Sequence, residues 1–274
     1  MPHKWVHSIW YKKYHNGQSL DYKNPKTYDE KIHWHIVNTY GPAYGKYADK
    51  YQVRQYVEEC GLRDLLIPLV GGPYKTVEEI DFDSLPDEFV IKTTHASGPQ
   101  HYYICKDKTK VDKTALCRQM NAALRENYEK RDFEYHYSGT KPQLICEQLL
   151  HTNTERMTDY KVVCSYGRPI AILVCYNRNQ GRDYYSPEWD YLEYTKEQFR
   201  SSTPIEKPGC LAEMLNAAGK LSKPFPLARI DFYIVNDKLF FGEITLTPSA
   251  GRHNNLNSFG ELELGRQLPP GAEI

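Results

Sequence analysis

The sequence predicts an α+β protein in which helices alternate with antiparallel hairpins. Segments with apolar residues at helical spacing are interleaved with short apolar runs that end at turn residues. Several of these runs are joined by short turns, which favours antiparallel pairing over a doubly wound parallel sheet. With 274 residues, 40% of them hydrophobic and 26% charged, the chain is long enough for one large domain or two small ones.

The helices are expected from capping signals and from apolar periodicity. Residues 1–24 are rich in Tyr, Trp, His and Lys without a clean period, and we interpret them as part of a packed N-terminal cap. A capping-box pattern, Thr-Tyr-Asp-Glu, predicts a helix over residues 27–37. A second helix is expected over residues 47–60, with Gly61 as its stop. A third, over residues 112–130, places its leucines and Met120 on one face.

The strands are expected from short apolar runs bounded by turns. Two of them flank a loop of small and polar residues, and two later pairs are hairpins. A further helix, marked by apolar residues between 211 and 221, separates these hairpins. The expected strands are residues 89–92, 102–105, 143–147, 160–165 and 170–176, followed by a hairpin that carries Asp231 and Glu243.

The two carboxylates of this last hairpin are the most informative feature of the chain. Asp231 and Glu243 each stand in an apolar strand, where an acid is costly unless something pairs with it. Two such acids facing one cleft offer only oxygen atoms, which suit hard cations such as Mg²⁺. The pattern therefore indicates chemistry on a phosphate.

The two acids can share an ion only if they lie on one face of the hairpin. A two-residue turn at Asn236-Asp237 would set Asp231 opposite Gly242, whereas a loop one residue longer would set it opposite Glu243. We therefore expect an odd-length loop or a compensating bulge. The carboxylates should then lie about 4–6 Å apart, the reach of shared divalent coordination.

Charge and cysteine content narrow the function classes. Lys+Arg and Asp+Glu both number 35, so no global basic field exists to recruit nucleic acid. The seven cysteines are scattered and never spaced as C-x-x-C, which indicates buried free thiols rather than disulfides or a zinc site. Neither a signal peptide nor a membrane-spanning run is recognised, so we expect a cytoplasmic protein, with peripheral membrane contact left open.

Seven segments of the chain form an ordered set with a characteristic spacing. They are Asn24-Pro25-Lys26-Thr27-Tyr28-Asp29-Glu30-Lys31-Ile32, Ala48-Asp49-Lys50-Tyr51-Gln52-Val53-Arg54, Phe89-Val90-Ile91-Lys92, His95-Ala96-Ser97-Gly98, Ile104-Cys105-Lys106-Asp107-Lys108, Asp159-Tyr160-Lys161 and the terminal Arg-x-Asp…Gly-Glu-x-Thr-x-Thr-Pro. In their order and spacing these segments resemble the TupA-like family of the ATP-grasp superfamily, over roughly residues 24–260. ATP-grasp proteins hold ATP between two α+β subdomains of mostly antiparallel sheet. The resemblance implies a helical cap over residues 1–45, a small subdomain over 46–147 and a large one over 148–274.

The resemblance also implies a nucleotide site. Two lysines would contact phosphates, a mobile loop would close over them, and Glu147 would lie at the adenine and ribose hinge. The alternatives are a surface lysine for Lys50, a plain hairpin turn for the loop and a strand-end acid for Glu147. Ala96 stands where relatives often have glycine, so the loop is expected to be stiffer. The implied nucleotide-binding residues are Lys50, Lys92, His95, Ser97, Gly98, Glu147 and Asp159.

The same resemblance implies catalytic and metal-binding residues. Lys161, Arg178 and Arg229 would bracket the γ-phosphate and the acceptor carboxylate, although a structural Arg229–Asp231 ion pair is a competing interpretation. The implied metal ligands are Asp231, Glu243 and Thr245. Many ATP-grasp enzymes have asparagine where Thr245 stands, and a hydroxyl is a weaker ligand than an amide oxygen.

The implied function is an ADP-forming carboxylate–amine ligase that uses ATP with Mg²⁺, or Mn²⁺, and passes through an acyl phosphate. Its substrates would be a uronic acid or peptide carboxylate and an amino compound of a bacterial surface polysaccharide such as a capsule. The alternatives are a small-molecule or sugar kinase, a non-catalytic polysaccharide-assembly protein and a glycosyltransferase. The last would need an Asp-x-Asp metal site, and Asp81-Phe82-Asp83 has that spacing but precedes a proline-containing turn.

Overall fold

The computed structural model describes residues 2–151, 158–176, 181–202 and 205–270. The chain divides into two compact units. The terminal unit combines Met1–Gly41 with Thr152–Ile274, and the central unit is Pro42–His151. The N-terminal segment thus forms one unit with the C-terminal segment. The subdomain boundaries after residues 45 and 147 remain a prediction.

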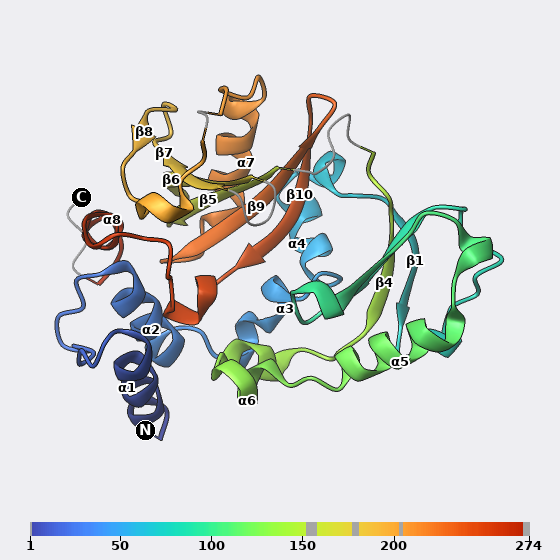
Figure 1. Ribbon diagram of the computed structural model, residues 1–274, viewed down its shortest axis with the longest axis horizontal. Coiled ribbons are helices and arrows are strands. Elements are labelled where there is room, and N and C mark those ends of the chain that lie inside the picture. Colours follow the sequence, from blue (N-terminus) through green and yellow to red (C-terminus); the bar gives the residue numbers. More distant parts are fainter. Residues whose placement is uncertain (1, 152–157, 177–180, 203–204, 271–274) are drawn as a thin grey trace. The chain divides into compact units, whose positions relative to one another are not determined.

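The terminal unit is built on a six-stranded antiparallel sheet with the order β10-β9-β5-β6-β7-β8 (Figure 1). Both predicted hairpins are present, as neighbouring strand pairs of this sheet. The strands are β5 (Asp159–Ser165), β6 (Arg168–Tyr176), β7 (Gly181–Tyr185), β8 (Tyr191–Leu192), β9 (Ala228–Val235) and β10 (Lys238–Thr245).

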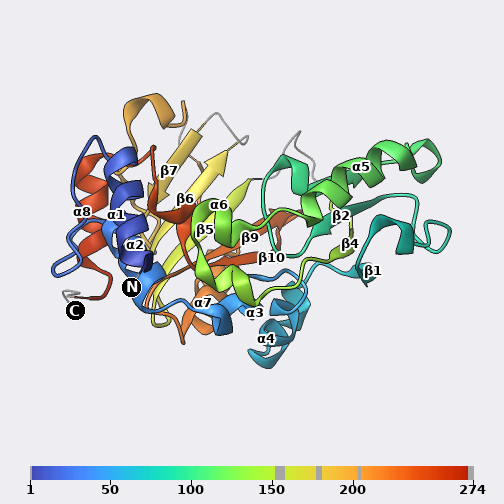
Figure 2. The same ribbon diagram turned by 90° about the horizontal axis from the view of Figure 1, so that it is seen from below.

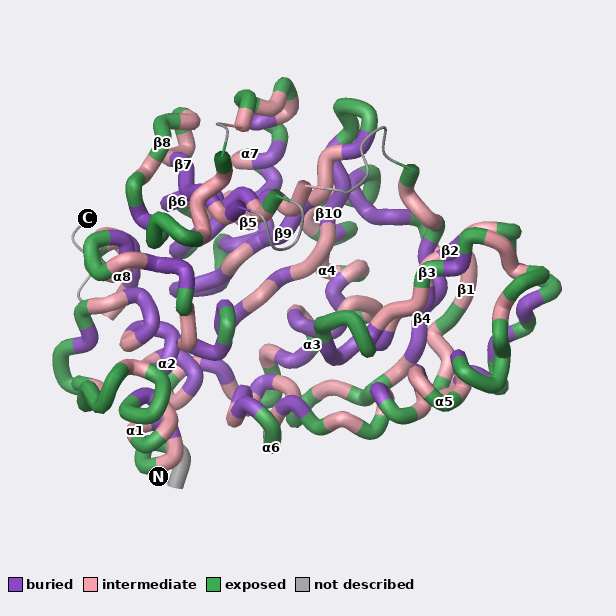
Figure 3. The backbone as a smooth tube through the Cα atoms, viewed as in Figure 1, coloured by how far each residue is buried: buried purple, intermediate pink, exposed green. Residues whose placement is uncertain are grey.

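One face of this sheet is covered by α7 (Leu211–Ser222), which packs against β5, β6 and β9. Along β9 the side chains alternate, so Ile230 and Phe232 are fully buried while Arg229 and Asp231 leave the opposite face. Figure 3 shows how much of the central strands is buried. The polar residues of the predicted site therefore share the face that α7 does not cover.

Three helices of the terminal unit pack near the end of β10. They are α1 (Pro2–Tyr14), α2 (Tyr28–Asn38) and α8 (Ser258–Arg266). The capping box of α2 is present, because Thr27 accepts from the Glu30 amide and Glu30 reaches back to the cap. α2 contacts both α8 and the turn Pro248–Gly251 that follows β10. This packing ties the N-terminal segment to the strand that carries Glu243.

The central unit has a four-stranded antiparallel sheet with the order β1-β4-β2-β3. Figure 2 labels β1, β4 and β2 of this sheet. Phe89 and Ile91 of this sheet pack with Leu116 and Met120 of α5 (Lys113–Leu124) in one hydrophobic core. The opposite face carries Lys92. The strands are β1 (Leu69–Tyr74), β2 (Phe89–Thr93), β3 (Tyr102–Cys105) and β4 (Leu144–Gln148).

The helix predicted over residues 47–60 is wrong as a single element. The structure has α3 (Gly45–Ala48) and α4 (Val53–Glu59), separated by extended backbone at Asp49. The Asp49 carboxylate accepts the amides of Tyr51 and Gln52, at 3.0 and 2.9 Å. A local side-chain cap therefore replaces the helical bonds that would have continued the helix.

The helix predicted over residues 112–130 also ends early. α5 stops at Leu124, and α6 (Tyr128–Asp132) begins afresh with Asn127 as its cap. Asn127 accepts the Lys130 amide in this way at 2.9 Å. An asparagine that caps a new helix has a non-helical backbone, so the apolar period continues across two elements rather than one.

The cysteines are present as thiols, without disulfide bonds. All seven cysteines are free, and Cys105, Cys146 and Cys164 are buried, which confirms the interpretation as buried free thiols for these three.

Among the described residues, every helix is too short or too polar to cross a bilayer. Short 3-10 turns occupy Pro42–Tyr44, Arg63–Leu65, Val77–Glu79, Pro99–His101, Lys108–Lys110, Tyr135–Gly139, Glu197–Phe199 and Pro248–Gly251.

Candidate functional site

The two acids of the last hairpin lie directly opposite each other. The turn is the two-residue Asn236-Asp237, because Val235 pairs with Lys238, and a bulge at Gly242 then restores the pairing of Asp231 with Glu243. Directly opposed residues of an antiparallel pair share a face of the sheet. The expected compensating bulge is therefore confirmed, and both carboxylates leave the same face.

Backbone chemistry explains why the bulge falls at Gly242. A Cβ there would lie 3.1 Å from the Asp231 carbonyl oxygen and 3.1 Å from the Tyr233 ring, so a side chain would crowd the partner strand. The turn residues Asn236 and Asp237 both have positive φ, 50° and 61°, which suits the tight hairpin turns these residue types favour. Turn and bulge together set the register of the acids.

Asp231 is held by cations from its own strand and from the next. Arg229 donates Nε and Nη2 to its two oxygens, at 2.7 and 2.8 Å. Lys161, which lies opposite Asp231 on β5, places Nζ 2.5 Å from Oδ2. Asp231 is 3% exposed, so these charge-assisted bonds offset the cost of burying its carboxylate.

Glu243 completes the cluster on β10. Arg229 Nη2 lies 3.7 Å from Glu243 Oε1 as well as 2.8 Å from Asp231 Oδ2, so one guanidinium nitrogen lies close to both acids. Thr245 donates its hydroxyl to Glu243 at 3.1 Å and accepts from Arg229 at the same distance. Asp159 stands at the edge, 3.8 Å from Lys161. The predicted metal ligands thus form one oxygen-rich patch.

The cations of the cluster remain charged despite their burial. Burial alone would lower the pKa of Lys161, but the charges of Asp231 and Asp159 outweigh it and the pKa is raised. Burial is likewise outweighed for Arg229, whose pKa is raised by Asp231 and Glu243. The ion pair proposed as the alternative role of Arg229 is present here. It lies within the site, so the two interpretations are compatible.

In the central unit the predicted Lys92 and Glu147 form an ion pair. They lie on neighbouring strands, and Lys92 Nζ is 2.6 Å from Glu147 Oε2. Arg54 Nη1 approaches the other oxygen of Glu147 at 3.4 Å. Arg54 belongs to the matching segment around Lys50 but was given no role from the sequence. Its position indicates a second cation beside the predicted hinge acid.

The predicted phosphate loop is anchored by contacts within its own unit. Lys50 donates Nζ to the Ala96 carbonyl at 2.7 Å and its amide to the Thr94 carbonyl at 2.8 Å. The Tyr128 hydroxyl donates to the Ser97 carbonyl at 2.6 Å and accepts the Ser97 amide at 3.1 Å. Gly98 has φ 106°, a conformation that favours glycine. The Ser97 amide, a candidate phosphate donor, is thus occupied by Tyr128.

His95 is packed beneath this loop. Its ring is 2% exposed, and Nε2 lies 3.1 Å from the Glu126 carbonyl. Burial lowers its pKa to about 4, so the ring is neutral near pH 7. In this conformation His95 contacts protein rather than solvent. Its predicted nucleotide contact therefore requires the loop to move.

One predicted catalytic residue, Arg178, lies outside the described residues, and one buried tyrosine has a hydroxyl that is unpartnered within them, which the sequence did not indicate. Tyr28 is 1% exposed, and its hydroxyl has no hydrogen-bond partner among the residues that the structure describes. Burial raises its pKa well above the usual value, while the Arg229 charge opposes this. A tyrosine beside a capping box carries no sequence signal for such a position.

The sequence matches the TupA-like ATPgrasp family over residues 30–268. No curated protein matches the chain. Among solved structures, an L-amino acid ligase from Bacillus licheniformis is similar, with 11% identity, a TM-score of 0.52, and coverage of 97% of this chain and 62% of that chain. A D-alanine–D-alanine ligase from Bacillus anthracis gives 14% identity, a TM-score of 0.48, and coverage of 81% and 62%.

A D-alanine–D-alanine ligase from Helicobacter pylori is also similar, with 14% identity, a TM-score of 0.44, and coverage of 81% of this chain and 61% of that chain. The chain therefore spans about three fifths of the length of these ligases. At 11% identity the similarity to the L-amino acid ligase concerns the fold alone, and it agrees with the predicted α+β architecture.

Proposed function

Because the chain belongs to the TupA-like ATP-grasp family, we propose that it is an ADP-forming carboxylate–amine ligase. The observation that carries the proposal is the pairing of Asp231 with Glu243 on one face of the hairpin. Lys161 and Arg229 stand beside these acids. Oxygen ligands for a hard cation next to two fixed positive charges are what phosphoryl transfer to a carboxylate requires.

The donor atoms at this patch fit Mg²⁺, and also Mn²⁺. Asp231, Glu243 and Thr245 would hold the ion through oxygen alone, the chemistry that these cations prefer. The Glu243 side chain is 27% exposed, against 4% for Asp231, so Glu243 is the more accessible ligand. Asp231 is already paired with Arg229, and ion binding would therefore require partial release of that pair.

Residues of the central unit would hold the nucleotide. Lys92 and Lys50 would contact phosphates, the amides of residues 94–98 would bind phosphate oxygens, and Glu147 would accept from the ribose. Asp159 would contribute from β5. The occupied Ser97 amide supports a loop that must exchange its Tyr128 bonds for phosphate bonds.

When bound, Mg-ATP would supply the γ-phosphoryl group that turns a substrate carboxylate into an acyl phosphate, which an amine attacks with release of phosphate. Arg229 and Lys161 would orient the carboxylate and stabilise charge that develops on its oxygens. Arg178 is proposed for the same role. The closed loop would exclude water, since an acyl phosphate otherwise hydrolyses.

The substrates that we propose are a uronic acid or peptide carboxylate and an amino compound, joined in bacterial surface-polysaccharide synthesis in the cytoplasm. This choice rests on the family context alone. The cation pair formed by Lys161 and Arg229 is compatible with any carboxylate and does not select among them. Neither substrate class requires nucleic acid.

The first experiment tests the metal-dependent ATP site. Purified protein should bind ATP more tightly with Mg²⁺ than without it, and turnover with candidate uronic or amino acids should release ADP. Glu243→Gln should abolish turnover with its circular dichroism unchanged. Glu213→Gln, the same change on exposed α7 across the sheet, is the matched control and should remain active. Release of AMP and pyrophosphate would overturn the proposal.

A second experiment separates a ligase from a kinase. Enzyme, Mg-ATP and candidate carboxylates are incubated with hydroxylamine, which converts an acyl phosphate to a hydroxamate but leaves a phosphate ester intact. Hydroxamate that depends on Glu243 supports the ligase. A stable phosphorylated product that accumulates without any amine identifies a kinase. Absence of turnover with every carboxylate, despite ATP binding, argues for a non-catalytic role.

A further inference from the structure

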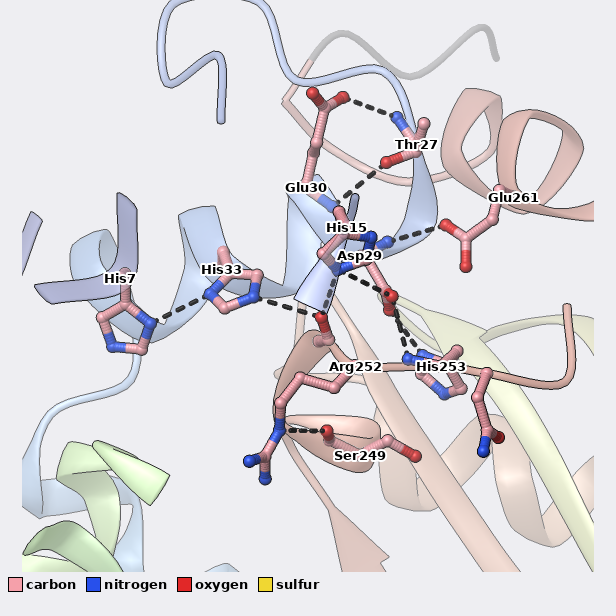
Figure 4. Close-up of polar contacts among 12 residues, drawn as sticks. His7, His15, Thr27, Asp29, Glu30, His33, Ser249, Arg252, His253 and Glu261 are labelled. Carbon is pink, nitrogen blue, oxygen red and sulfur yellow. Dashed lines mark hydrogen bonds and ion pairs between the residues drawn. The ribbon is translucent and has the colours of Figure 1, made fainter. Parts of the chain in front are cut away.

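A second group of potential metal ligands lies in the terminal unit, apart from the predicted metal ligands. Asp29 comes from the first turn of α2, His253 from the loop after β10, and Glu261 from the first turn of α8 (Figure 4). Each residue offers one ligand atom, and these atoms all lie within 4.8 Å of one another. Three separate elements thus converge on one small volume.

Asp29 is the centre of this group. Its side chain is completely buried, and His253 approaches it twice, with Nδ1 2.5 Å from Oδ1 and the backbone amide 2.9 Å from Oδ2. His15 Nε2 lies 3.4 Å from Oδ2. The Asp29 amide in turn donates to Glu261 Oε2 at 3.1 Å (Figure 4). The two carboxylates are therefore brought together by the backbone itself.

One oxygen of the second carboxylate, that of Glu261, lacks a hydrogen-bond partner among the described residues. This oxygen, Oε1, is shielded from solvent. Leaving a buried carboxyl oxygen without a hydrogen-bond partner destabilises the fold, more so if the oxygen is charged. A cation bound between the two acids would account for both the unpartnered oxygen and their close approach.

The surroundings make this a formed site rather than a loose acidic patch. The Gly251 carbonyl accepts from His33 Nε2 and lies equally close to His15 Nε2, both at 3.1 Å. A Cβ at Gly251 would lie 2.7 Å from the His33 ring, so only glycine fits there. The loop that carries His253 is therefore held against α2 from several sides, which fixes the ligand positions.

We propose that Asp29, His253 and Glu261 bind a divalent transition-metal ion, with Zn²⁺ as the best fit and Mn²⁺ or Co²⁺ as substitutes. One imidazole and two carboxylates form a ligand set typical of zinc, with bond lengths of about 2.0–2.2 Å. Reaching these lengths requires His253 Nδ1 and Asp29 Oδ1, which are now 2.5 Å apart, to separate, while the ligand atoms that are up to 4.8 Å apart approach one another. A water molecule would complete a four-coordinate shell.

Such an ion would have a structural role distinct from the metal that serves phosphoryl transfer. It would join α2, α8 and the loop following Thr245, and thereby brace the end of the strand that carries Glu243. Binding must displace the proton between Asp29 and His253, because a ligand nitrogen needs a free lone pair. The inference does not depend on the proposed ligase activity.

The test uses the full chain after chelation and dialysis, in a Glu243→Gln background that disables the other metal site. Zn²⁺, Mn²⁺ and Co²⁺ are added singly, and bound metal is measured by equilibrium dialysis with mass spectrometry. We expect one Zn²⁺ per chain and a rise in melting temperature on its addition. Glu261→Gln and His253→Gln should each weaken Zn²⁺ binding about a hundredfold or more, since even outer-shell partners cost 10–100-fold.

Glu263→Gln, on the same helix but outside the group, is the matched control and should bind Zn²⁺ like its parent. Cobalt adds an independent readout, because its visible absorption should show nitrogen and oxygen ligation that disappears in His253→Gln. Unchanged Zn²⁺ affinity in a folded Glu261→Gln protein overturns the proposal. So does a parent protein that retains no Zn²⁺, Mn²⁺ or Co²⁺ after dialysis.

Discussion

The polar centres of the two units differ in their balance of acidic and basic side chains. In the terminal unit, Asp231 and Glu243 lie beside Arg229 and Lys161, so acids for a cation are held by neighbouring basic side chains. In the central unit, the single acid Glu147 is flanked by Lys92 and Arg54. The first centre is suited to a metal ion and the second to phosphate.

The two centres also differ in what holds them in place. The terminal cluster is fixed by strand register, because Lys161, Asp231 and Glu243 stand in one row across β5, β9 and β10. The loop of residues 94–98 in the central unit, which we predict to bind phosphate, is held by hydrogen bonds to its backbone from Lys50 and Tyr128. A sheet row changes only if strands slip, whereas a few side-chain bonds can exchange. We therefore expect a rigid centre in one unit and a movable loop in the other.

The largest loss of stability should come from removing the Asp231 charge from the cluster in the terminal unit. Asp231→Asn leaves Lys161 and Arg229 buried without their closest counter-ion, with Asp159 and Glu243 only 3.8 and 3.7 Å away, and should lower the free energy of unfolding by about 3–5 kcal/mol. Urea denaturation followed by circular dichroism measures it. Asp237→Asn, the same change in the turn of the same hairpin, is the control. Equal stability of the two variants would show that the row does not hold the sheet.

A smaller effect is expected at the corresponding acid of the central unit. Glu147→Gln removes the carboxylate that Lys92 and Arg54 share, but the Lys92 side chain is 23% exposed and can be solvated. We expect a loss of about 1–3 kcal/mol, the range of hydrogen bonds to charged groups. The exposed Glu59→Gln of α4 is the control in the same denaturation series. A loss as large as that of Asp231→Asn would contradict the comparison.

Acid should destabilise both units through neutral buried histidines. Burial lowers the pKa of His136 in the central unit and of His33 in the terminal unit to about 3. Below about pH 6.5 these histidines bind protons in the unfolded chain but stay neutral in the folded protein. The free energy of unfolding therefore decreases as the pH falls towards 3. Each such histidine contributes at most about 1.4 kcal/mol per pH unit.

Denaturation midpoints between pH 7.5 and 5 test this point. His136→Gln should flatten the pH dependence whatever it does to stability at neutral pH, because it removes one ionisable group. His151→Gln, the same change at a side chain that is 67% exposed, is the control with which the slope of His136→Gln is compared. A wild-type protein equally stable at pH 7.5 and pH 5 would refute the prediction.

The smallest change in the free energy of unfolding is expected for Tyr128→Phe, which should nevertheless clearly increase the mobility of the loop of residues 94–98. Tyr128→Phe removes the hydroxyl that bonds both backbone groups of Ser97, at a cost of about 0.5–1.5 kcal/mol. Amide hydrogen exchange should speed up in residues 94–98 and stay unchanged in β9. Tyr103→Phe on β3 serves as control. Unaltered exchange at Ser97 would mean that Tyr128 does not anchor the loop.

Much of the fold and the outline of the site were predictable because their signals are local. The capping box, the apolar alternation of the hairpins and the left-handed tolerance of Asn236 and Asp237 each act over a few residues. Two acids in apolar strands indicate a functional site, because burying a carboxylate without a partner costs free energy. The sequence even restricted the hairpin to two solutions, and the compensating bulge at Gly242 is the one adopted.

The two helix predictions that failed have local causes, because side-chain caps at Asp49 and Asn127 interrupt an apolar period that continues past them. What went unseen depends on a distant partner, since the anchoring of Ser97 requires Tyr128. This contact has no local signature, because a buried contact between remote segments leaves no period in the chain.

The sequence by itself determined the α+β class, the two hairpins of the terminal unit and the acids of the last hairpin. Only the tertiary structure decided that Asp29, His253 and Glu261 meet, since α2, the loop after β10 and α8 are far apart along the chain. The physical reason is that periodicity and capping report backbone preferences over a few residues. The meeting of charges depends on how packed elements exclude water, and that is settled only when the whole unit has folded.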